Sequence, residues 1–281
     1  MKRLSTRRWI TPFTLVIVAA ATGASFLIPL VWILTGSFRP GLETFSYLEP
    51  LSFSTFVELE PIVDNYLALV DSQLGLAIFN SISAATWAVV FGLIVSSMAA
   101  FALATIPFRG SGVVFSVVII ALLIPFDAIA IPLAQLFREW GLQDTMQGLV
   151  LPGIANGMAI FMLRTFFLGI PKELVEAARV DGLNWWGIFR RIFLPLSIAP
   201  LIGAGLMLFL FQWHSYVWPL LIGTSDATLI GPIALANMKT QYSVDYGQLF
   251  AGSIILSIVP LVLILLGQKQ FIQNHTSSGI K

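Results

Sequence analysis

Residues 170–195 have the sequence IPKELVEAARVDGLNWWGIFRRIFLP, a charged stretch in an otherwise apolar chain. Pro171 suits the first position of a helix, and Glu173 lies in the first turn, where the helix dipole favours an anion. Gly182 can take the left-handed conformation that ends a helix. The pattern predicts a helix over 171–182 of about eleven residues, which is too short to cross a membrane.

One stripe of this helix is formed by residues at the spacing i, i+3, i+4 and i+7: Leu174, Ala177, Ala178 and Asp181. Its two alanines would let a partner come close to the backbone. Glu176 and Arg179 are spaced to pair, a contact that contributes only about 0.2–0.5 kcal/mol. From these residues alone, a connecting surface helix without a partner explains the stretch equally well.

The sequence on both sides of this stretch has the composition of a membrane protein. Hydrophobic residues make up 57% of the 281 residues and charged residues only 10%, against roughly 25% charged in soluble domains. The net charge of +1 does not indicate binding to nucleic acid. Long runs without charge predict six membrane-spanning helices in contact with lipid, near residues 12–36, 77–105, 111–133, 148–168, 198–222 and 249–267.

The distribution of basic residues predicts the orientation. With the N-terminus in the cytoplasm, twelve of the fifteen basic residues fall on the cytoplasmic side, the exceptions being Arg39, Arg138 and Lys239. Both termini are then cytoplasmic. The first span could instead be a signal peptide, but its apolar run is too long for one.

We expect residues 1–281 to form a single permease-like membrane domain. Its parts are a cytoplasmic tail at 1–11, an outer loop at 39–75 with room for one or two short helices, a core at 76–267 that includes the cytoplasmic helix, and a tail at 268–281. The second outer loop, 223–247, is rich in Gly, Thr and Ser and is predicted to be irregular.

The inventory of reactive side chains predicts no catalytic and no metal-binding residue. The chain has no cysteine, and its two histidines, His214 and His275, are far apart in sequence. It also lacks HExxH, GxSxG and the phosphate-binding GxxxxGK[ST] motif. If ATP drives this protein, the nucleotide must be bound by another subunit.

Within 170–195, Glu176-Ala177-Ala178 is followed after three residues by Gly182, after nine more by Ile192, and then by Leu194-Pro195. This spacing is similar to the EAA loop of binding-protein-dependent ABC importer permeases. Further likenesses to the carbohydrate-uptake subgroup, which includes maltose-type and glycerol-3-phosphate-type permeases, lie at Asn65-Tyr66, Phe79-Asn80-Ser81, Ile131-Pro132-Leu133, Gly141-Leu142 with Asp144-Thr145, Leu151-Pro152 and Trp218-Pro219-Leu220.

The resemblance implies an all-α polytopic fold of the type I ABC importer kind in the bacterial inner membrane. It implies four kinds of partner: a second permease subunit, an ABC ATPase dimer that holds ATP and Mg, an extracytoplasmic solute-binding protein, and a carbohydrate or polyol-like solute. It also implies that the short helix couples to the ATPase, through residues Glu176, Ala177, Ala178, Arg179, Asp181 and Gly182. Two departures from the family pattern, Trp213-His214-Ser215-Tyr216 and the tail 276–281, leave the solute and any tail contact open.

Aromatic and polar side chains in the fifth span and one acid in the third are candidates for the substrate pathway: Gln212, Trp213, His214, Tyr216 and Asp127. Aromatic faces beside hydrogen-bonding groups suit sugar rings, and polar groups are costly in lipid. The alternative for these aromatic residues is an interfacial belt, which we favour for Trp218. Asp127 could equally reach the outer surface.

Other functions stay open at this point. An ion-coupled secondary carrier working alone would need buried ionisable groups, for which Asp127 is the one candidate. A membrane-embedded enzyme would need nucleophiles or metal ligands. A permease for a solute other than carbohydrate also fits the residues.

Overall fold

The computed structural model describes residues 7–48, 50–238 and 244–276, with side chains from 13 to 267. Every regular element in these ranges is helical. This confirms the all-α prediction. The predicted boundaries of the two tails fall partly on helix, since α1 (Arg7–Gly36) begins at residue 7 and α15 (Tyr246–Thr276) continues to residue 276.

Two compact units are formed by the chain, one from Met1–Ser72 with Asn237–Ile255 and the other from Gln73–Ala236 with Leu256–Lys281. The first unit contains α1, α2 (Phe53–Phe56), α3 (Asp64–Val70) and the start of α15. The two short helices lie where the outer loop 39–75 was expected to hold one or two.

The Asn65-Tyr66 pair closes the end of α1 in this first unit. The Nδ2 atom of Asn65 donates to the carbonyl oxygens of Ser37 at 2.8 Å and Arg39 at 2.7 Å. The Tyr66 hydroxyl lies 2.7 Å from that of Ser37. Arg39 itself is buried and forms an ion pair with Glu58. Most of the buried polar groups of this segment therefore have partners, the Arg39 Nη1 atom being an exception among the described side chains.

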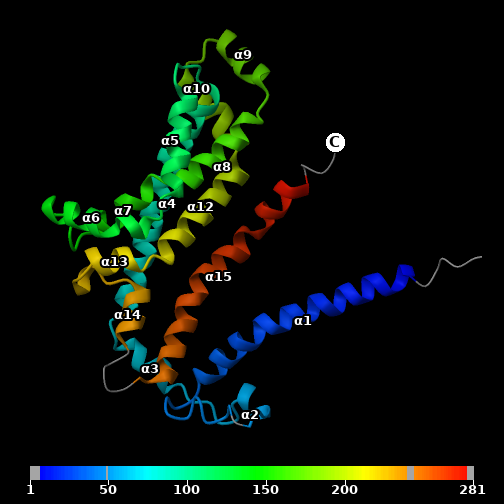
Figure 1. The fold of residues 1–281 in the computed structure, drawn as a ribbon, viewed down its shortest axis with the longest axis vertical. Helices are drawn as coiled ribbons and strands as arrows, with labels where there is room; N and C mark the ends of the chain where they lie inside the picture. The colour runs from blue at the N-terminus through cyan, green and yellow to red at the C-terminus, as the bar shows by residue number, and fades with distance from the viewer. Residues whose placement is uncertain (1–6, 49, 239–243, 277–281) are drawn as a thin grey trace, which may run out of the picture. The chain divides into compact units, whose positions relative to one another are not determined.

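The second unit is built around three helices that pack along one another: α4 (Leu74–Thr105), α8 (Gly157–Leu168) and α12 (Ile198–Trp213) (Figure 1). Small residues such as Ala85, Ala88 and Gly92 are buried along α4, and an added methyl at Gly92 would lie 3.0 Å from the Leu208 side chain. Small side chains let helices approach closely where lipid gives no hydrophobic drive between them.

The remaining helices of this unit are short: α5 (Ser111–Leu123), α6 (Phe126–Glu139), α7 (Met146–Ile154), α9 (Lys172–Val180), α10 (Trp185–Ile188), the π-helix η1 (Phe189–Phe193), α11 (Leu194–Leu196), α13 (Val217–Ile222), the 3-10 turn η2 (Asp226–Thr228) and α14 (Gly231–Asn237). The turn η2 and helix α14 lie inside the predicted irregular loop 223–247, of which residues 239–243 fall outside the described ranges. The first part of that loop is therefore ordered.

Six apolar segments are present where six spans were predicted, but only three of them are straight helices among the described residues. The predicted spans 111–133 and 148–168 correspond to helix pairs bent by 96° between α5 and α6 and by 41° between α7 and α8. The predicted span 198–222 begins with α12, which is bent by 83° from the preceding segment Trp185–Leu196, a segment that the prediction left out. The predicted fifth span also ends early, since α12 stops at Trp213 and α13 starts at Val217.

Local chemistry explains these breaks. Pro125 precedes α6 and cannot donate a backbone hydrogen bond to α5. Asn156 caps α8, its side chain accepting from the Ala159 N–H at 3.1 Å. Before α12, the π-helix η1 ends at Phe193, and Pro195 follows in the short helix α11, just ahead of the bend. Broken helices at membrane depth are tolerated only where protein or water covers them.

Candidate functional site

Helix α9 occupies the predicted position within 171–182. The Gly182 backbone is left-handed, with φ at +82°. The Leu183 N–H donates to the Ala178 carbonyl at 2.9 Å, and the Gly182 N–H donates to the Arg179 carbonyl at 3.1 Å. These two bonds form a complete Schellman motif, which satisfies the last carbonyls of the helix. The predicted helix and its glycine end are confirmed.

The inner face of α9 differs from the predicted stripe. Ala178 is buried at 4% exposure and Val175 is half-buried against the same apolar cluster, whereas Leu174, Ala177 and Asp181 are exposed. The predicted pair of Glu176 with Arg179 is not formed among the described side chains. The Arg179 guanidinium instead lies 4.8 Å from the centre of the Trp185 ring, a cation–π contact.

An aromatic cluster joins α9 to the bundle. Its buried members come from α4, α8, α9, η1, α12 and the segments beside α9: Ala100, Phe101, Leu163, Phe167, Ile170, Ala178, Ile188, Phe189, Phe193 and Ala204. The Phe101 and Phe193 rings lie 4.8 Å apart and the Phe167 and Phe193 rings 5.3 Å apart, both edge to face. This close packing fixes α9 to the ends of these helices.

Three of the five predicted pathway residues line one cavity. The cavity measures about 670 Å³ and lies where two helix breaks meet, with Asp127 just after the α5–α6 break and His214 and Tyr216 in the α12–α13 break. All three side chains are exposed. The walls combine a carboxylate, an imidazole and hydroxyl groups with aromatic rings, a set able to hydrogen-bond a polar solute.

Gln212 and Trp213 do not line this cavity. Gln212 is buried, and its Nε2 atom donates to the Leu149 carbonyl of α7 at 3.3 Å. Trp213 is buried and stacks on Phe209, with ring centres 5.4 Å apart. Gln212 therefore links α12 to α7, whereas the stack of Trp213 on Phe209 lies within α12.

The interfacial position predicted for Trp218 is wrong. Trp218 is only 2% exposed. Its indole Nε1 donates to the Gly148 carbonyl at 3.0 Å, and its ring packs edge to face on Phe137, with centres 5.1 Å apart. A buried indole N–H needs such a partner, so Trp218 fastens α13 to α7.

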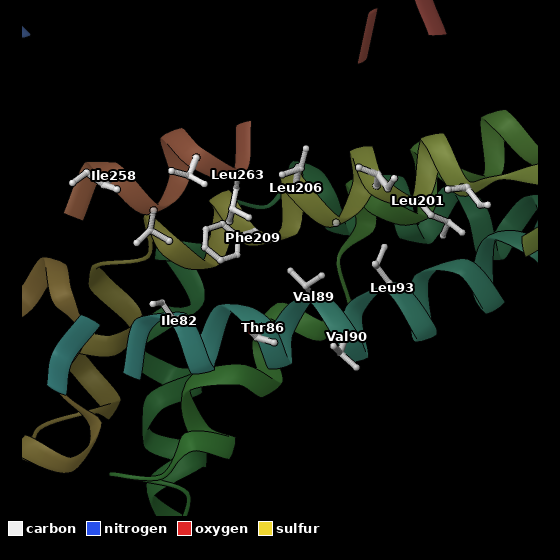
Figure 2. A pocket seen from close by; sticks show the side chains of 15 residues that line it. Ile82, Thr86, Val89, Val90, Leu93, Leu201, Leu206, Phe209, Ile258 and Leu263 are labelled. Atoms are coloured by element: carbon white, nitrogen blue, oxygen red, sulfur yellow. The ribbon is translucent and has the colours of Figure 1, made fainter. Parts of the chain in front are cut away.

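A second cavity, of about 770 Å³, lies between α4, α12 and the part of α15 in the same unit. Figure 2 shows the side chains that line it, which are leucine, isoleucine, valine and Phe209 side chains with Thr86 as a polar residue. This wall has no charged residue and offers a hydrophilic solute almost no hydrogen bonds.

Asp144 is a further functional candidate, which the sequence indicated only as part of the Asp144-Thr145 pair. Among the residues that the structure describes, Asp144 is the non-glycine residue whose backbone φ is positive, at 54°. Its carboxylate accepts the Ser225 N–H at 2.7 Å, the Thr224 N–H at 2.6 Å and the Thr228 hydroxyl at 3.1 Å. The Ser225 bond, with those from Thr224 and Thr228, lowers the pKa of Asp144 from 3.8 to about 2.

The same loop is also tied to the start of α4. Asn80 Nδ2 donates to the carbonyls of Ala227 and Leu229 at 3.1 and 3.0 Å, and the Ser81 hydroxyl accepts the Gly231 N–H at 2.9 Å. Within the second unit, α9 lies at one end and α13 and α14 lie toward the other (Figure 1). The unit thus presents a short exposed helix at one end and a clamped loop near the other.

Comparisons with known proteins agree with this arrangement. Residues 92–273 match the family described as "binding-protein-dependent transport system inner membrane component". The chain is 36% identical over 259 residues to the arabinooligosaccharides transport system permease protein AraQ of Halalkalibacterium halodurans, covering 90% of each chain. It is 30% identical to the trehalose transport system permease protein SugB of Mycobacterium tuberculosis, covering 91% of this chain and 92% of that one.

Two solved structures share the fold. A bacterial ABC transporter involved in the import of the acidic polysaccharide alginate superposes with a TM-score of 0.80 at 20% identity, covering 96% of this chain and 99% of that one. A bacterial alginate ABC transporter in complex with an alginate pentasaccharide-bound periplasmic protein superposes with a TM-score of 0.65 at 16% identity, covering 93% of each chain. The chain belongs to the family of binding-protein-dependent transport system inner membrane components and is a membrane permease of that family.

Proposed function

We propose that this permease forms one half of the translocation pathway of an ATP-driven importer for a sugar or sugar-like solute. Its partners are a second permease subunit, two ABC ATPase subunits that carry ATP and Mg, and an extracytoplasmic binding protein. The relatives named for arabinooligosaccharides and trehalose support a carbohydrate cargo. The alginate transporter in complex with a periplasmic protein supports a binding-protein partner.

The observation that carries this proposal is helix α9, which is exposed on one face and fixed to the bundle on the other. The side chains of Glu173, Glu176 and Ala177 are exposed, so an ATPase subunit can contact them, while Ala178 is anchored in the aromatic cluster. A rigid helix of this kind passes motion of the ATPases to the spans, and ATP then shifts the population between two packings of the bundle.

The site residues take roles on this basis. The face that docks on the ATPase is formed by exposed residues of α9 and its C-terminal end: Glu176, Ala177, Arg179, Asp181 and Gly182. Ala178 anchors this face to the bundle. Asp127, His214 and Tyr216 contact the solute as it passes the cavity at the helix breaks. Gln212 positions α12 against α7 and does not bind solute, and Trp213 is buried outside this cavity. The loop at 223–231, clamped by Asp144 and Asn80, offers a rigid surface to the binding protein.

The proposed orientation places both termini and α9 in the cytoplasm and the 223–231 loop outside. The positions of α9 and of this loop toward opposite ends of one unit support it. The distribution of basic residues also supports this orientation, since twelve of the fifteen fall on the predicted cytoplasmic side.

Transport in reconstituted vesicles tests the proposal. The complete importer is assembled from this chain, its sister permease, the ATPase and the binding protein, and is offered radiolabelled arabinotriose, trehalose and glycerol 3-phosphate. We expect uptake of at least one sugar that requires ATP and stops when the ATPase is omitted. Uptake by this chain alone, driven by an ion gradient, would show that it is a secondary carrier.

A further inference from the structure

Two aromatic rings on α4 lie parallel and open to the outside of the second unit. Trp87 and Phe91 are one turn apart, with ring centres 5.5 Å apart and planes inclined by 18°. They are 48% and 43% exposed. A cavity of about 460 Å³ lies over them, with α7 as its other wall, and this volume falls within the range of small-molecule sites, roughly 300–1,000 Å³.

The floor of this groove, which we call the aromatic groove, is rigid. Ala84 and Ala88 of α4 and Val150 of α7 form a buried cluster beneath it. From behind, α7 is held by two side-chain hydrogen bonds, Gln212 to the Leu149 carbonyl and Trp218 to the Gly148 carbonyl. The two walls of the groove are therefore fixed relative to each other, which lowers the entropy lost when a ligand binds.

The aromatic groove also contains a polar group that lipid would not favour. Gln147, in the first turn of α7, is exposed and lines the groove. An exposed primary amide within an apolar segment indicates a polar cavity or a polar ligand. The larger cavity in Figure 2 has no amide and no exposed pair of parallel rings. The two cavities on α4 therefore differ in the chemistry that they offer.

Flat apolar faces beside an amide match the surface of a sugar ring, which has C–H groups on its faces and hydroxyls around its edge. We propose that the aromatic groove is a sugar-binding subsite in which a ring of a neutral saccharide stacks on Trp87 and Phe91 while the Gln147 amide hydrogen-bonds its hydroxyls. This inference rests on the proposed import of a saccharide. It adds a binding site separate from the Asp127–His214–Tyr216 cavity.

Cysteine labelling tests whether the aromatic groove is open to water and sugar. Because the chain has no cysteine, Phe91→Cys provides a single thiol in the complete importer. The control is Ile82→Cys, which lies on the same helix but lines the apolar cavity of Figure 2. We expect a charged, membrane-impermeant maleimide to label Phe91→Cys and not Ile82→Cys. Arabinotriose or trehalose, whichever the wild-type importer takes up, should slow that labelling.

Substitution of Trp87 tests the stacking itself. Trp87→Leu should lower uptake of that same sugar at saturating binding protein by about tenfold, as expected for the loss of one apolar stacking face, while Trp87→Phe stays within about twofold. Ile94→Ala, one turn beyond the groove on the same helix, should leave uptake unchanged. Membrane insertion should be alike in all variants, and Ile94→Ala should also leave basal ATP hydrolysis unchanged.

Three results would overturn the subsite. Phe91→Cys could react only with lipid-soluble reagents, the sugar could leave its labelling rate unchanged, or Trp87→Phe and Trp87→Leu could have equal effects on uptake. Failure of the proposed function itself would be seen separately, as the absence of ATP-dependent sugar uptake in the wild-type importer.

Discussion

Replacement of Gly182 by valine tests how the end of α9 contributes to coupling. Gly182 has φ at +82°, and an added Cβ would meet no atom within 4 Å. The effect of a side chain is therefore backbone strain and not a clash. A non-glycine residue in this region raises the free energy by about 1–2 kcal/mol, and a β-branched residue is a genuine outlier there.

This strain is comparable in free energy to the hydrogen bonds of the Schellman motif that ends α9. The two Schellman bonds contribute roughly 0.5–1.5 kcal/mol each, so strain of about 1.4 kcal/mol shifts the ratio of capped to frayed helix ends about tenfold. We expect Gly182→Val to reduce sugar uptake per ATP hydrolysed by about fivefold to tenfold, because a frayed end no longer moves rigidly with the spans. Gly182→Asn should retain most coupling, since asparagine tolerates the left-handed region.

A matched control exists in the same chain. Gly141 has φ at +70°, open space around its Cβ position and the same pair of bonds, Leu142 N–H to the Phe137 carbonyl at 2.8 Å and Gly141 N–H to the Arg138 carbonyl at 3.0 Å. Gly141→Val therefore introduces equal strain at the end of α6. The assay compares uptake and ATP hydrolysis in reconstituted vesicles at equal membrane content. Equal uptake-to-hydrolysis ratios for Gly182→Val and Gly141→Val would show that the end of α9 has no special part in coupling.

Three further substitutions test the clamps. Asp144→Asn should lower the unfolding temperature of the purified protein at pH 7. Because the pKa of Asp144 is lowered in the fold, the difference in unfolding temperature from wild type should persist from pH 8 to about 5 and shrink as pH falls from about 4 to about 2. A difference that vanishes near pH 6 would contradict this expectation. Asn80→Ala leaves the Ala227 and Leu229 carbonyls without their amide donor, so hydrogen exchange of residues 223–231 should speed up relative to α8, and unchanged exchange would refute the clamp. Gln212→Leu removes the donor to the Leu149 carbonyl and should destabilise the protein by about 1–3 kcal/mol without changing which sugar is taken up, whereas a switch in preferred sugar would return Gln212 to the pathway.

Hydrophobicity and helix-end signals were sufficient to predict the apolar segments and α9. Uncharged length marks a span, and the proline and glycine at 171 and 182 mark the ends of a short helix, because these signals act locally. The bends were not predicted. Pro125 and Asn156 are local signals for two of them, but hydropathy does not record the direction of a helix.

The partners of polar side chains depend on contacts far along the chain and could not be predicted. Asp144 binds residues about 80 positions away, and Asn80 about 150 positions away. Gln212 was assigned to the pathway because an amide is costly in lipid, yet a buried carbonyl of α7 satisfies it equally well. Trp218 was assigned to the membrane interface for a similar reason, yet its indole N–H has a partner inside the unit.

The proposed coupling requires contact between α9 and an ATPase subunit, which cross-linking from single cysteines detects. Ala177→Cys lies on the exposed face of α9, and Thr224→Cys lies on the clamped loop of the same unit. In inner-membrane vesicles that contain the complete importer, a short bifunctional maleimide should join Ala177→Cys to the ATPase and leave Thr224→Cys unjoined to it. An ATPase adduct from Thr224→Cys, or none from Ala177→Cys at equal labelling, would contradict the account.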